Sequence, residues 1–179
     1  MDKIKRVSRR FRILFQFLFY ITPAMIVWFW LSIHGAFDIF SQFGIGSEFF
    51  VWPTTLNGLT RFLGIMASIL PASIFMYSVH QLIKIFRHYE EGDIFSTDNA
   101  NRYKKLAYAL FAQVIGGLFY KTLMSLVMTF QNTGAGQKII AINVDGMDFV
   151  VLITGGIILL IAWVMTEAQK VSEDQSFTV

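Results

Sequence analysis

The chain has 179 residues, of which 55% are hydrophobic and 15% charged, against about 25% charged in an ordinary soluble domain. Its formal net charge of +3 comes from basic residues that stand beside apolar stretches, which favours attraction to anionic lipid headgroups over binding of nucleic acid. The chain has no cysteine, which excludes disulfides, thiolate catalysis and cysteine-ligated metals.

Four stretches are apolar enough to cross a bilayer, which takes about 20 mainly apolar residues. They cover residues 12–34, 59–86, 106–131 and 149–166. We therefore expect an all-α integral membrane protein, a single domain over residues 1–179 whose four transmembrane helices form an antiparallel bundle. A cleaved signal peptide is the alternative for the first stretch. That stretch is longer than the usual core of about 7 to 15 residues and no small-x-small site follows it, so we expect an uncleaved helix.

Basic residues alternate between the loops. The first 12 residues are rich in Lys and Arg, residues 35–58 contain neither, the connection between the second and third stretches is basic again, and the last loop has only Lys138. The positive-inside rule then places both termini in the cytoplasm.

The two outer loops have their own patterns. The first is rich in aromatic residues, which favours an interfacial half-helix at 36–43 and an extended piece at 49–54 on the membrane surface; packing against the other outer loop is the alternative. In that other loop, the β-prone residues 138–144 run into Asp145-Gly146, which favours a small β-hairpin.

Small residues recur at one depth in the third and fourth stretches, and we hypothesise a tight helix contact there. The residues are Gly116, Gly117, Gly155 and Gly156. The alternative is that membrane helices are simply rich in glycine. Pro23 and Pro71 are expected to bend the first two helices, either around a cavity or to fit their neighbours.

Lys121 is the most conspicuous charge within a predicted span, and with Thr122 and Ser125 it forms a candidate intramembrane polar site. A buried Lys is costly unless it finds water or a partner. It either lines a polar cavity that binds an anionic group, or it snorkels toward the outer surface or a loop acid such as Asp148. Arg61, at the outer end of the second span, is expected to be an interface anchor.

The elbow, residues 87–105, is the strongly polar block between the second and third spans. Gly92 and Asp93 permit a turn, and Ser96 or Thr97 can cap the helix that follows. Phe95 occupies the position of a hydrophobic staple. The helical spacing that continues beyond the cap predicts a segment along the inner interface that then turns into the third span.

The run Gly92-Asp-Ile-Phe-Ser-Thr-Asp-Asn-Ala-Asn-Arg102, between a second and a third membrane span, resembles the signature of the DUF2975 family of bacterial integral membrane proteins. The resemblance implies a four-helix protein of the bacterial inner membrane with unassigned activity, often encoded beside a small helix-turn-helix regulator. It implies no catalytic residues.

No nucleophile, phosphate-binding, zinc-protease or dinucleotide motif is present, and His34 and His80 are too isolated to form a metal site. We therefore expect no enzymatic activity, no cofactor and no metal. The leading hypothesis is a regulatory or interaction protein that presents the elbow, the basic N-terminal segment and the tail 167–179 to a cytoplasmic protein partner. The candidate interaction residues are Gly92, Asp93, Phe95, Ser96, Asn99 and Arg102.

The alternatives are a channel built by oligomers, with polar groups such as Lys121 facing inward, and a protein that handles lipids or other small molecules. Expected partners are membrane lipids and further copies of the chain, without direct binding of nucleic acid.

Overall fold

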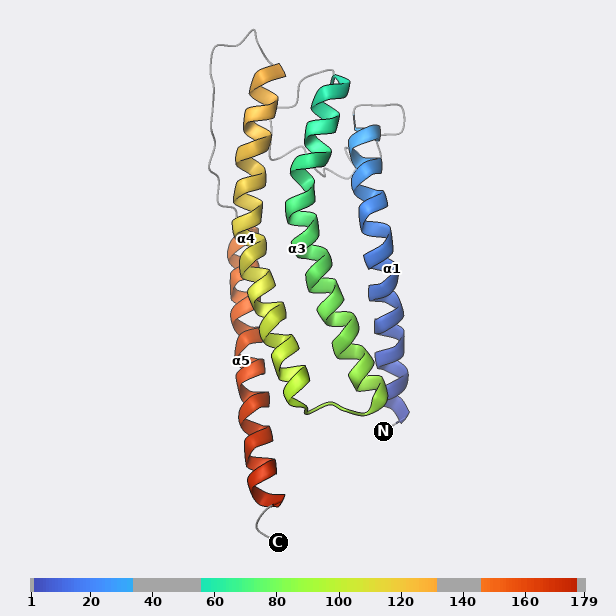
Figure 1. Cartoon of the computed structure of the whole chain (residues 1–179), viewed down its shortest axis with the longest axis vertical. Coiled ribbons are helices and arrows are strands. Elements are labelled where there is room, and N and C mark those ends of the chain that lie inside the picture. Colours follow the sequence, from blue (N-terminus) through green and yellow to red (C-terminus); the bar gives the residue numbers. More distant parts are fainter. Residues whose placement is uncertain (1, 34–55, 132–145, 177–179) are drawn as a thin grey trace. The chain divides into compact units, whose positions relative to one another are not determined.

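The computed structural model describes residues 2–33, 56–131 and 146–176. In these residues the chain forms helices and no strand. The helices are α1 (Asp2–Ser32), α3 (Gly58–Glu91), α4 (Thr97–Gln131) and α5 (Gly146–Ser176) (Figure 1). All four are long and apolar enough to cross a membrane, which confirms the predicted all-α, multi-pass membrane protein.

Several predictions fall on residues outside the described ranges. They are the half-helix at 36–43, the extended piece at 49–54, the hairpin strand at 138–144, and any role of His34. Gly146, the second residue of the expected hairpin turn, is the first residue of α5.

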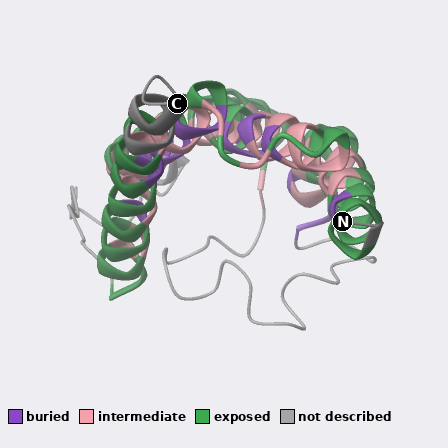
Figure 2. Ribbon diagram, turned by 90° about the horizontal axis from the view of Figure 1, so that it is seen from below, coloured by how far each residue is buried: buried purple, intermediate pink, exposed green. Residues whose placement is uncertain are grey.

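Large apolar side chains are exposed along all four helices, and Figure 2 shows exposed residues over much of each one. Phe17 of α1, Phe62 of α3, Phe119 of α4 and Trp163 of α5 are examples. Exposure of so many apolar side chains to water would oppose folding through the hydrophobic effect, whereas lipid solvates them well. Helices suit that solvent because they satisfy their backbone hydrogen bonds internally.

Each helix is longer than the apolar stretch that predicted it. α1 begins at Asp2 and α3 continues to Glu91, while α5 extends to Ser176. α4 is one uninterrupted helix from Thr97 to Gln131. The prediction of a separate interfacial segment that turns into the third span is therefore wrong. Hydropathy marks only the part of a helix that needs lipid, because water and ion pairs can solvate its polar continuation.

The described helices divide into two compact units. Unit 1 comprises Met1–Tyr20, Ile74–Val114 and Asp145–Val179, and unit 2 comprises Ile21–Ser73 and Ile115–Val144. The division falls close to Pro23, Pro71 and Gly116. Both prolines lie inside helices that continue past them, although each removes one backbone hydrogen bond.

The core of unit 2 is built around Trp30, which packs with Ala67 and Met124. The indole N–H of Trp30 donates to the hydroxyl of Ser68 at 3.0 Å. The ring lies so close to Gly64 that a Cβ on this residue would overlap it. Only glycine therefore permits this approach of α1 to α3.

Arg61 of α3 caps the C-terminal end of α1 in the same unit. Its guanidinium donates to the carbonyls of Trp30 at 2.7 Å, Leu31, and Ile33 at 3.0 Å. The last carbonyls of a helix have no partner within it, so a cation with several donors stabilises this end. Arg61 thus holds α1 to α3, a role beyond the expected interface anchor.

Aromatic rings join α1 to α3 in unit 1. Phe86 stacks on Phe11 with centroids 5.3 Å apart and on Phe15 at 5.6 Å. Such pairs add roughly 0.5–1.5 kcal/mol to the burial of their surfaces. The base of α1 is therefore fixed beside the last turns of α3.

α4 and α5 meet in unit 1 where Gly155 faces Phe111. A Cβ on Gly155 would lie 2.8 Å from the Phe111 ring, so the missing side chain makes room for it. One of the four predicted packing glycines thus lies at a close approach of α4 and α5, with an aromatic ring as its neighbour. Gly116 and Gly117 belong to unit 2, and their predicted contact with α5 stays a prediction.

Candidate functional site

The elbow contains the end of α3, a short connection at residues 92–96 and the start of α4. Gly92 has φ +96°, a left-handed conformation that side chains disfavour. The N–H of Gly92 donates to the carbonyl of Tyr89 at 3.2 Å, and the N–H of Asp93 donates to that of His88 at 2.9 Å. This pair of bonds is the Schellman motif, which stops a helix and satisfies its last carbonyls. The predicted turn at Gly92 and Asp93 is confirmed.

The start of α4 is capped by Ser96. Its hydroxyl accepts from the N–H of Asn99 at 3.4 Å, and its carbonyl accepts from the N–H of Ala100 at 3.0 Å. Of the two candidates for the cap, Thr97 instead donates its hydroxyl to Gln169 of α5 at 2.8 Å. The cap and α5 therefore fix the start of α4 together.

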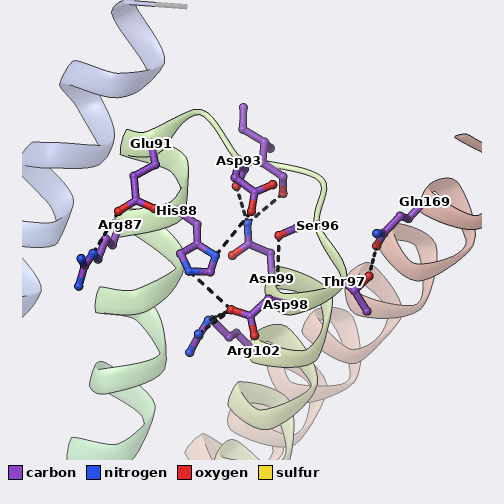
Figure 3. Close-up of polar contacts among 11 residues, drawn as sticks. Arg87, His88, Glu91, Asp93, Ser96, Thr97, Asp98, Asn99, Arg102 and Gln169 are labelled. Atoms are coloured by element: carbon purple, nitrogen blue, oxygen red, sulfur yellow. Dashed lines mark hydrogen bonds and ion pairs between the residues drawn. The ribbon is translucent and has the colours of Figure 1, made fainter. Parts of the chain in front are cut away.

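Asn99 holds the connection in place. It has no exposed surface, and its amide nitrogen donates to the carbonyls of Asp93 at 2.7 Å and Ile94 at 3.1 Å. Figure 3 shows this side chain reaching from α4 back to the connection. Asn99 thus acts by positioning the backbone and offers no surface to a partner, unlike the contact residue that the sequence predicted.

Polar side chains link the two helices of the elbow. The His88 ring lies between two carboxylates, with Nε2 3.5 Å from Asp98 and Nδ1 3.9 Å from Asp93 (Figure 3). Asp98 also accepts two hydrogen bonds from the guanidinium of Arg102, at 2.6 and 2.9 Å. An acid in the first turn of α4 also favours the helix dipole. Arg102, a candidate contact residue, is mostly buried by these interactions.

The N-terminal part of α1 is bound to the elbow by ion pairs. Arg12 donates to Glu90 at 2.7 Å, and Arg9 lies 3.8 Å from the same carboxylate. The hydroxyls of Tyr89 and Tyr103 are 2.8 Å apart and join α3 to α4. Glu90 is engaged in ion pairs, and the described residues contain no cluster of His, Cys, Asp and Glu that could hold a metal ion.

Phe95 lies in the connection between α3 and α4 and is exposed. It is 70% exposed, so its predicted role as a hydrophobic staple is wrong. A staple at this position would pack on Ala100, whose methyl group is buried and too small to cover a ring. Asp93 is also exposed beside Phe95. Of the candidate contact residues, Gly92, Asp93 and Phe95 are exposed, and Phe95 is the one with a large apolar side chain.

The candidate intramembrane site lies on α4 in unit 2. The hydroxyl of Thr122 donates to the carbonyl of Leu118 at 2.9 Å, so its helix backbone satisfies it. Lys121 and Ser125 each take part in an interaction as well. The channel that would require these groups to face inward stays a prediction.

His88 and Glu90 were not singled out as site residues by the sequence. The available signal was the charge pattern: in an antiparallel pair of spans, the acidic end of α3 lies at the same level as the basic start of α1. That inference needs the partner helix to be known, because Arg12 and Glu90 are 78 residues apart in sequence.

One comparison with known proteins is positive. The family model described as "Protein of unknown function (DUF2975)" matches residues 46–179, well over half of the chain, including the whole elbow. No curated protein and no solved structure matches the chain. The match confirms the resemblance carried by the run from Gly92 to Arg102, and the chain belongs to the DUF2975 family.

Proposed function

We propose that the protein is a non-enzymatic component of the bacterial inner membrane that presents its elbow to a protein partner in the cytoplasm. The observation that carries this proposal is a contrast within the elbow. Asn99 has no exposed surface and holds the connection in place, whereas Phe95, within that connection, is 70% exposed. A rigid backbone that presents an aromatic side chain binds at a low entropic cost.

The cytoplasmic placement of the elbow is supported by two kinds of observation. Basic residues flank the elbow and the start of α1, as the positive-inside rule requires of cytoplasmic segments. Within unit 1, Lys5 approaches Gly92 and Gln169 bonds Thr97, so the beginning of α1 and the second half of α5 lie beside the elbow. Both described ends of the chain then share its side of the membrane.

The described part of the elbow favours binding over catalysis. Its carboxylates at Asp98 and Glu90 are held by Arg102 and Arg12 in tight ion pairs. A general acid or base needs a proton that it can exchange with a substrate, and a nucleophile needs an adjacent base. The paired charges fix the backbone instead.

Photocrosslinking in host membranes tests the proposal. Phe95→benzoylphenylalanine places the probe on the exposed ring position, and Phe119→benzoylphenylalanine, at a residue 60% exposed in the apolar part of α4, is the matched control. We expect a discrete protein adduct from position 95 and lipid adducts from position 119. Adding Asn99→Ala to the first variant should weaken the protein adduct, because the connection loses its two bonds. Lipid adducts alone from position 95 would refute the proposal and make Phe95 a membrane anchor.

A further inference from the structure

A hollow of about 320 Å³ lies between the first turns of α1 and the last turns of α3, within unit 1. Its walls are mainly apolar and aromatic. The residues that line it are Lys3, Ile4, Val7, Ser8, Phe11, Phe86 and Tyr89. An apolar recess at the polar end of a membrane helix favours an apolar ligand, because binding removes these side chains from water.

The apolar wall continues from the hollow into the predicted first span. Ile4, Val7, Phe11 and Leu14 recur at intervals of three and four residues, so they form one row along α1. All four are exposed, Val7 by 44%. At about 1.5 Å per residue the row extends roughly 15 Å, which suits much of an extended acyl chain.

A row of cations runs along α1 beside the apolar row, and its first member, Lys3, also lines the hollow. Lys3, Arg6 and Arg10 follow the same spacing on the adjacent strip of α1, and no acid among the described side chains pairs with them. Arg12 lies on the opposite strip, where Glu90 neutralises it. The apolar row of α1 therefore has positive charge on one side and a neutralised ion pair on the other.

We infer that this hollow binds one anionic phospholipid, with the phosphate at the row of Lys3, Arg6 and Arg10 and an acyl chain along Ile4 to Leu14. The charge of the rim selects an anion, and the apolar row gives affinity only to a ligand that also has a hydrocarbon chain. A soluble phosphate would leave the apolar wall unused. The site rests on the membrane fold and Phe95 does not line it, so its test does not depend on the protein partner proposed above.

Native mass spectrometry tests the charge row, with the full chain released from nanodiscs of equimolar phosphatidylglycerol and phosphatidylcholine. Lys3→Gln with Arg10→Gln should lower the ratio of bound phosphatidylglycerol to phosphatidylcholine about 25-fold, at about fivefold for each cation removed. Lys104→Gln with Lys105→Gln removes the same charge from the start of α4 and should leave the ratio unchanged. An equal decrease of this ratio in both variants would show general attraction to the membrane surface and would refute the proposed site.

A second pair of variants tests the hollow without changing charge. Val7→Trp should fill it and abolish the retained phospholipid, while Val27→Trp, on the same helix at 43% exposure, should not. Thermal unfolding of both proteins in detergent controls for damage to the fold. Equal lipid retention by both would overturn the proposal. Binding of glycerol phosphate by the lipid-free protein would overturn it too, because the ligand would then be a soluble anion.

Discussion

Replacement of Asn99 by alanine tests how the elbow is held. The side chain has no exposed surface and makes two hydrogen bonds to backbone carbonyls, at 2.7 Å to Asp93 and 3.1 Å to Ile94. A net contribution of about 1 kcal/mol for each bond gives about 2 kcal/mol for the pair. The loss should fall on the connection, because both acceptors lie there.

The expected readout is hydrogen exchange of backbone amides around the connection. The N–H groups of Gly92 and Asp93 are protected by bonds to the last carbonyls of α3, and the N–H of Ala100 is protected by Ser96. If these bonds open together, a loss of about 2 kcal/mol accelerates their exchange roughly 30-fold. Mass spectrometry of peptides from residues 88–101 in detergent or nanodiscs would measure it.

Asn101 offers a matched control, since it is the same residue type two positions later on α4 and is exposed. Asn101→Ala should leave the exchange of the connection unchanged or slightly slower, because alanine favours a helix more than asparagine does. Equal acceleration in the two variants would contradict the role given to Asn99. So would acceleration spread evenly over all four helices, since that indicates a loss of global stability.

Three further substitutions have defined outcomes in thermal unfolding of the detergent-solubilised protein. Gly64→Ala should destabilise by about 1–3 kcal/mol because its methyl group would overlap the ring of Trp30, whereas Gly58→Ala, with no atom within 4 Å, should not; equal midpoints would refute the close contact. Arg61→Met should cost about 2 kcal/mol through lost bonds to the end of α1, and an unchanged midpoint would show that water replaces them. Gly92→Ala should cost about 1–2 kcal/mol because of its positive φ, and an unaltered unfolding curve would contradict the left-handed turn.

The sequence predicted the helices well because spanning a bilayer imposes a length and a composition that few other segments meet. It also predicted the turn at Gly92 and the cap, because both depend on local chemistry: a residue free to take positive φ and a hydroxyl before the helix. Thr97 was an equal candidate for the cap. Its bond to Gln169 of α5 depends on tertiary packing that local rules do not contain.

The errors and omissions have different causes. Phe95 fits the staple position in sequence, but the small side chain of Ala100 leaves it nothing to cover. The polar start of α4 was predicted as a separate segment because hydropathy changes near residue 106, although the helix backbone does not break there. Arg61 and Glu90 acquire their roles only when α1 lies beside α3, and no periodicity within one helix reports on that contact.

If the four helices span the inner membrane with the elbow in the cytoplasm, as we propose, a single thiol on the elbow should react only from the cytoplasmic side. The chain has no cysteine, so Phe95→Cys introduces the only one, at an exposed position of the elbow. Phe119→Cys, in the apolar part of α4, is the control that the bilayer should shield from a membrane-impermeant maleimide. We expect labelling of position 95 in inverted inner-membrane vesicles and none in intact spheroplasts. Labelling in intact spheroplasts would contradict the proposed placement.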